Sequence, residues 1–169
     1  MVAATPPTVD VQAGAAALDE DIPRVLSLLG AESLEQLGWS RPNRLTLLVP
    51  MWGMNGTTRD DYLLRLGFQA YRRWPPGAQF VNPATLTYQY PDDEKFVPRL
   101  ASQECHTHSN YQSVGGRTLQ LVCCSAVCEF YEIQHDVHEE HVWRETDTFY
   151  KTIMAIRKAF GSSYGGRFN

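Results

Sequence analysis

The spacing of apolar residues predicts a helix near each end of the chain. Within residues 21–30, apolar side chains recur at helical intervals, after an aspartate that can cap a helix and before a glycine that can end one. Residues 147–161 likewise begin with an aspartate and end with a glycine, and four apolar side chains there share one helical face. These four are Phe149, Ile153, Ile156 and Phe160.

Shorter segments between these helices have the character of β-strands. Residues 44–50 are rich in β-forming side chains, and the Gly- and Asn-containing stretch 51–58 predicts a turn after them. Residues 118–124 also favour a strand, which could continue as far as Tyr131. Residues 82–107 contain three prolines and predict irregular structure.

Residues 62–81 predict the clearest pair of strands. Apolar residues alternate with other residues in the first half, which indicates a half-buried strand. Pro75 and Pro76 fix φ and remove N–H donors, so they end one strand and direct the chain into the next. We therefore expect two antiparallel strands joined through residues 71–76, with their apolar side chains facing a helix. These side chains are Leu64, Leu66, Phe68 and Phe80.

A helix, a meander of antiparallel strands and a second helix define an α+β fold with helices on one face of a sheet. The length of 169 residues is suited to one domain. We expect this domain to span residues 15–161, with a flexible tail at 1–14 and a frayed tail at 162–169.

The composition, 43% apolar and 20% charged residues, is that of a globular protein. The net charge of -4 comes without a run of basic residues, which argues against binding to duplex nucleic acid. The longest apolar stretches are far shorter than the roughly 18 residues that span a bilayer. Residues 1–14 lack the features of a signal peptide, so we expect a cytoplasmic protein without a membrane partner.

All cysteines and histidines of the chain fall within residues 105–141, which is the most informative feature of the sequence. Without an export signal, reduced thiols used for metal binding or chemistry are favoured over disulfides. The residues are Cys105, His106, His108, Cys123, Cys124, Cys128, His135, His138 and His141.

The segment YLLRLGFQAYRRWPPGAQFVNP, residues 62–83, resembles the centre of the ubiquitin-conjugating-enzyme (UBC-like) fold. In that family an alternating strand leads to a tyrosine, a Pro-Pro pair and a short strand ending in phenylalanine. Trp143, which precedes the last predicted helix, agrees with a tryptophan of the family. The resemblance covers residues 20–83 and 143–160 and implies a UBC-like domain.

The middle of the chain departs from that family. His108-Ser109-Asn110 stands where the family has His-Pro-Asn, but much later after Phe80 than in the family. The two positions at which the family's catalytic cysteine is expected, counted from this motif and from Trp143, are Thr118 and His135. The standard conjugating cysteine therefore has no counterpart that the sequence places.

The segment CEFYEIQHDVH, residues 128–138, resembles a metal-binding family found in bacterial gene clusters for ubiquitin-like conjugation and named for Cys, Glu, His and His. The resemblance implies Cys128, Glu132, His135 and His138 as metal ligands.

Thiolate, carboxylate and imidazole together suit zinc or another divalent first-row ion. Four ligands along one helix would spread over about 15 Å, too far for one ion, so the segment must bend or combine with other residues. The candidates that could complete the site are Glu129, Cys105, His106, His108 and Cys124. The plainer interpretation is that the histidines lie on a solvated face and the cysteines are small buried side chains.

Three functions follow from these residues. The first is a metal-binding accessory of a bacterial ubiquitin-like modification system, whose partner is the modifier or its activating enzyme. The second is a divergent conjugating-type enzyme that uses Cys123, Cys124 or Cys128 as nucleophile. The third is a metal-dependent hydrolase with a glutamate of residues 129–139 as general base.

Overall fold

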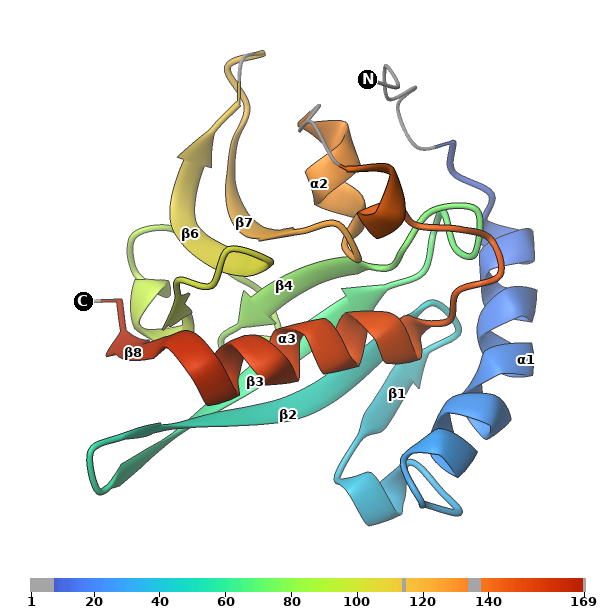
Figure 1. The fold of residues 1–169 in the computed structure, drawn as a ribbon, viewed down its shortest axis with the longest axis horizontal. Helices are drawn as coiled ribbons and strands as arrows, with labels where there is room; N and C mark the ends of the chain where they lie inside the picture. Colours follow the sequence, from blue (N-terminus) through green and yellow to red (C-terminus); the bar gives the residue numbers. More distant parts are fainter. Residues whose placement is uncertain (1–7, 114, 134–137, 169) are drawn as a thin grey trace.

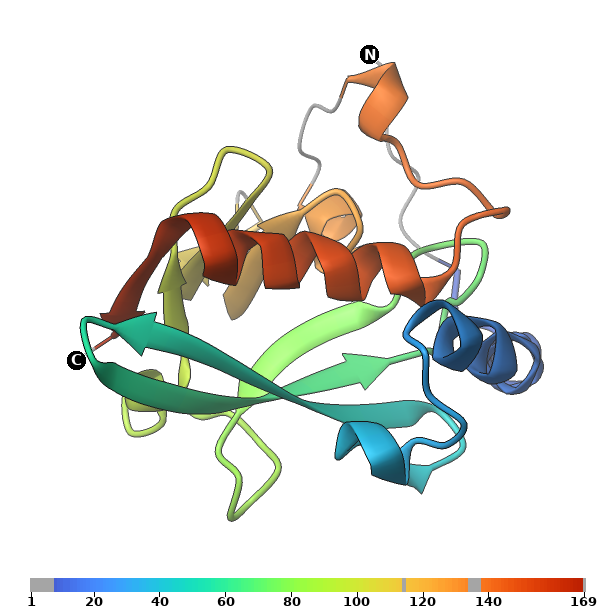
Figure 2. The same ribbon diagram turned by 60° about the horizontal axis from the view of Figure 1, so that its bottom comes forward.

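The structure, a computed structural model, describes residues 8–113, 115–133 and 138–168. An antiparallel sheet carries helix α3 (Phe149–Ser163) across one face, and helix α1 (Val11–Leu28) lies beside the sheet (Figure 1). Figure 2 shows α3 and the sheet as two layers. The predicted α+β class, with an N-terminal helix, an antiparallel meander and a C-terminal helix, is confirmed.

The main sheet is a meander in which consecutive strands are antiparallel neighbours. Its strands are β1 (Ser40–Asn43), β2 (Thr46–Asn55), β3 (Thr58–Gly67) and β4 (Gly77–Val81). The prediction of a turn over residues 51–58 is wrong for most of its length, because β2 continues to Asn55. Strand β3 pairs with the whole of β2, and this partner outweighs the local Gly and Asn content.

Smaller strand pairs also form in the part of the chain that the structure describes. Strands β5 (Pro98–Leu100) and β8 (Tyr164–Arg167) pair with each other, so β8 forms in a segment expected to be frayed. Strands β6 (Cys105–Gln112) and β7 (Thr118–Cys124) form an antiparallel hairpin beside β4 (Figure 1).

A short helix, α2 (Cys128–Glu132), follows β7, where the sequence allowed a continuing strand. Single-turn 3₁₀ helices also form within the described residues, at Glu35–Leu37, Glu94–Phe96 and Glu139–His141. In the part of the chain that the structure describes, none of the helices has both the length and the apolar character that crossing a bilayer requires.

The core lies between the sheet and α3. Leu64 and Leu66 of β3 are fully buried, as is Phe80 of β4, which pairs with Leu64. The ring of Phe68 packs edge-on against Phe149 of α3, with ring centroids 5.5 Å apart. The predicted strand pair over residues 62–81, with its apolar side chains facing a helix, is confirmed.

The first helix begins at Val11, not near residue 21, because Asp10 is its N-cap and accepts a hydrogen bond from the Ala13 N–H at 3.0 Å. Asp21, the cap expected from the sequence, lies inside the helix and is fully buried. Its carboxylate accepts a hydrogen bond from the Tyr71 hydroxyl at 2.6 Å and pairs with Arg72. A tertiary partner therefore explains an aspartate that local rules assign to a helix end.

The ends of α3 also differ from those expected. Thr148, and not the expected Asp147, is the residue before the first turn of α3. The Asp147 carboxylate instead accepts a hydrogen bond from the Lys151 ammonium at 2.8 Å. Gly161 lies within the helix, which ends at Ser163, and β8 begins at the next residue, Tyr164. Pairing of β8 with β5 fixes this boundary, and the sequence near Gly161 carries no sign of that pairing.

Candidate functional site

The β6–β7 hairpin distributes the cysteines and histidines between its two faces. Cys105 lies directly across from Cys124, and His106 across from Cys123. Because side chains of adjacent residues in a strand point to opposite faces, the two pairs lie on opposite sides of the hairpin. The site therefore has a dithiol face and a histidine-containing face.

On the dithiol face, Cys105 and Cys124 are buried and hydrogen-bonded to each other. This hydrogen bond, in which Cys105 is the donor, lowers the pKa of the Cys124 thiol. The same bond and burial raise the pKa of the Cys105 thiol. The two thiols therefore differ in acidity, and Cys124 is the more acidic of the pair.

The other face carries two histidines from alternate positions of β6. The imidazole centroids of His106 and His108 are 5.0 Å apart, with the rings steeply inclined to each other. Both histidines are half-buried, and the ring of His108 also lies 5.2 Å from that of Tyr111. Cys123, across from His106, is buried, and its burial raises the pKa of its thiol to about 11. Two imidazoles and a neutral thiol thus share this face of the hairpin.

Helix α2 places two of the predicted ligands one turn apart. Cys128 is buried, and burial followed by the nearby charge of Glu129 raises the pKa of its thiol. Its backbone N–H donates to the carbonyl of Pro76 at 3.1 Å, which ties the start of α2 to the start of β4. The Glu132 carboxylate pairs with the Arg117 guanidinium at 2.8 Å. One candidate ligand is therefore buried and the other already has a cationic partner.

The remaining predicted ligands are His135 and His138. His135 lies outside the described residues. His138 is exposed and precedes the 3₁₀ turn Glu139–His141, with its ring centroid 6.5 Å from that of His141. Among the described residues, no three His, Cys, Asp or Glu side chains are gathered closely enough to hold a metal ion. Because one member of the predicted four-ligand site has no described position, that site stays a prediction.

Glu129, considered as an alternative ligand, has a structural partner. Its carboxylate accepts a hydrogen bond from the Ala78 N–H at 3.1 Å, on the free edge of β4. Burial raises the pKa of this carboxyl to about 7. It also lines a polar cavity of about 610 Å³, to which Arg65, Gln79 and Arg117 contribute. A carboxyl with this pKa could transfer protons near neutral pH, but its contact with β4 already explains its burial.

The grouping of His106 and His108 on one face of a strand was not expected from the sequence. The pattern His-x-His within a strand was the available signal, because alternate residues of a strand share a face. The irregular structure expected over residues 82–107 hid that signal, since β6 begins at Cys105.

Comparisons with protein families, curated proteins and solved structures find no match to this chain.

Proposed function

We propose that this chain is a metal-binding accessory protein of a bacterial ubiquitin-like modification system, built on a UBC-like domain. The resemblances at residues 62–83 and 128–138 support the proposed system. The order of helix, antiparallel meander and helix agrees with the domain that the first resemblance implies. The expected partner is the ubiquitin-like modifier or its activating enzyme.

The observation that carries the metal proposal is the distance between the imidazoles of His106 and His108. With metal–nitrogen bonds of about 2.0–2.1 Å and tetrahedral angles, two imidazoles on one zinc ion have ring centroids about 5 Å apart. The measured separation is 5.0 Å. This separation is compatible with both imidazoles binding one ion, and both rings are partly exposed.

Further ligands must come from outside this pair, because zinc takes at least three protein ligands. Cys123 lies across the hairpin from His106, and an ion there would deprotonate its thiol. The predicted ligands His135 and Cys128 are the alternatives to Cys123. We propose zinc, or another first-row divalent ion, bound to His106, His108 and one or two of these side chains.

Elemental analysis of the purified full-length chain tests this proposal. We expect about one zinc ion per chain in the wild type and a loss of bound metal when His106 and His108 are both replaced by Ala. The matched control is Cys105→Ser, which changes a ligand-type residue on the opposite face of the hairpin and should keep the ion. Single His135→Ala, Cys123→Ser and Cys128→Ser variants then identify the remaining ligands. A wild-type chain without metal, or a double variant that retains its ion, would refute the proposed site.

A second function is favoured by the position of Cys124 directly across the hairpin from Cys105, whose hydrogen bond lowers the pKa of the Cys124 thiol. A thiolate at Cys124 could act as the nucleophile of a divergent conjugating-type enzyme. Its side chain is only 3% exposed, so a modifier could reach it only after local opening, and we rank this function second. Incubation with the activating enzyme, ATP and the modifier distinguishes the two functions. A thiol-sensitive adduct that disappears in Cys124→Ser would reverse our order.

A further inference from the structure

The rest of the chain covers the outer edge of β4 in the main sheet but leaves the outer edge of β2 largely open. On the outer edge of β4, the Phe80 N–H donates to the Gln120 side chain at 2.6 Å, and the Gln120 amide donates back to the Phe80 carbonyl at 2.8 Å. The neighbouring Ala78 N–H donates to Glu129. Side chains therefore satisfy the backbone groups that β4 would otherwise leave unpaired.

The outer edge of β2 has no such cover beyond its first residues. Strand β1 pairs with β2 only as far as Leu48. Asn55 pairs with Thr58 across a two-residue turn, and such a pair exchanges backbone hydrogen bonds. By the alternation of an antiparallel ladder, Trp52 and Met54 then direct their N–H and C=O groups away from β3.

The position of a proline supports this assignment of the edge. Pro50 falls on the same alternate positions as Trp52 and Met54, and proline is tolerated in a sheet where its missing N–H would face an open edge. Among the described residues, no hydrogen bond to the backbone of Trp52 or Met54 is found outside the ladder with β3. The edge therefore offers two unpaired donors and two unpaired acceptors.

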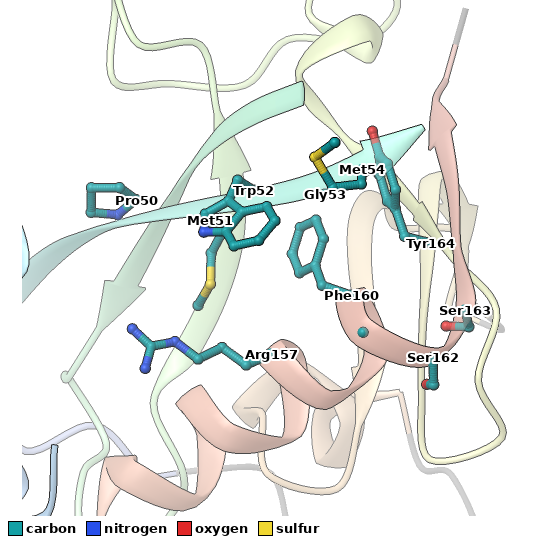
Figure 3. A pocket seen from close by; sticks show the side chains of 11 residues that line it. Pro50, Met51, Trp52, Gly53, Met54, Arg157, Phe160, Ser162, Ser163 and Tyr164 are labelled. Carbon is teal, nitrogen blue, oxygen red and sulfur yellow. The ribbon is translucent and has the colours of Figure 1, made fainter. Parts of the chain in front are cut away.

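This open edge forms one wall of a groove of about 680 Å³, whose other wall is the C-terminal part of α3. Trp52, Phe160, Arg157 and Tyr164 are among the residues that line it, with Arg157 toward one end and Tyr164 toward the other (Figure 3). Trp52 is 52% exposed and Met54 47% exposed, high values for such large apolar side chains. The groove thus combines backbone partners for a strand with apolar surface for its side chains.

Arg157 gives the groove a positive charge. Its side chain is exposed, and it forms no ion pair with the residues that the structure describes. A second cation, Arg59, lies over the Trp52 ring at 5.1 Å and pairs with Asp61. Because Arg157 has no ion-pair partner among the described residues, a segment that carries an acidic side chain is favoured as occupant.

We propose that the open edge of β2 binds an extended segment of a partner protein as an additional strand, with its alternate apolar side chains in the groove and an acidic side chain on Arg157. Backbone hydrogen bonds at Trp52 and Met54 supply affinity, while the apolar groove and the arginine select the sequence. Pro50 limits the added strand to the distal part of β2, because it offers no donor. The surface is separate from the proposed metal site on β6.

The test uses the full-length chain and random 12-residue peptides displayed on phage. Enriched peptides are synthesised, and their dissociation constants are measured for the wild type and for variants. We expect enriched sequences that alternate apolar and other residues and contain Asp or Glu. Met54→Pro should bind at least about fivefold more weakly than Met54→Ala, because the pair differs in one outward N–H.

Two further variants check the side-chain contacts. Arg157→Ala should weaken peptide binding, whereas Arg73→Ala, which removes an exposed arginine outside the groove, should not. If Met54→Pro is not folded by circular dichroism, the amide resonances of Trp52 and Met54 in the wild type should still shift when peptide is added. Enrichment of no peptide, equal binding by both Met54 variants, or a dimer of the chain that Trp52→Ala dissociates would overturn the proposal.

Discussion

Tyr71 connects three elements of the fold through its hydroxyl group, and Tyr71→Phe removes that group without changing the size of the ring. The hydroxyl donates to the Asp21 carboxylate of α1 at 2.6 Å and accepts from the Phe149 N–H, at the start of α3, at 3.0 Å. Burial, with Asp21 as the next cause, raises the pKa of Tyr71 and keeps this hydroxyl protonated. Tyr71→Phe therefore removes two buried hydrogen bonds and leaves almost no cavity.

The expected loss in the free energy of unfolding follows from these two hydrogen bonds. A hydrogen bond to a charged group contributes about 1.5–3 kcal/mol, and a buried N–H left without a partner costs about 1–3 kcal/mol. Asp21 keeps its contacts with Arg72 at 2.9 and 3.0 Å, which limits the loss on that side. We expect Tyr71→Phe to lower the free energy of unfolding by about 3 kcal/mol.

Urea unfolding followed by circular dichroism measures this change, with linear extrapolation to water. The matched control is Tyr90→Phe, the same substitution at a side chain that is 50% exposed, where the change should stay within about 0.5 kcal/mol. If Tyr71→Phe were no more destabilising than Tyr90→Phe, the hydroxyl would not connect α1 to α3 as described. Such a result would refute the reasoning.

Three further substitutions test how the layers are held together. A Cβ at Gly14 would lie 2.0 Å from the backbone oxygen of Phe68, so Gly14→Ala should displace α1 and destabilise the fold by about 2 kcal/mol or more, as measured by thermal unfolding. Gly161→Ala, with open space around its Cβ inside α3, is the control and should stabilise by up to about 1 kcal/mol. Gln120→Leu leaves both backbone groups of Phe80 without partners and should cost about 2–4 kcal/mol in urea unfolding; an unchanged stability would contradict the capping of the β4 edge.

The candidate site was predictable only in part. The clustering of Cys and His within residues 105–141 is visible in the sequence. Which of them face one another depends on the register of β6 and β7, which pairs Cys105 with Cys124 and His106 with Cys123. A shift by one residue would exchange the two faces of a strand, and nothing local to either strand sets that register.

Local physical chemistry explains what the sequence determined by itself: the amphipathic helix near the C-terminus, the strands on either side of Pro75 and Pro76, and hence the α+β class. Alternation and proline placement act within a few residues and need no distant partner. Tertiary structure alone decided that Asp21 is a buried partner of Tyr71 and that β2 runs to Asn55 beside β3. These features depend on groups far apart in the chain, because a buried charge or a long strand is stable only when another element supplies its hydrogen bonds.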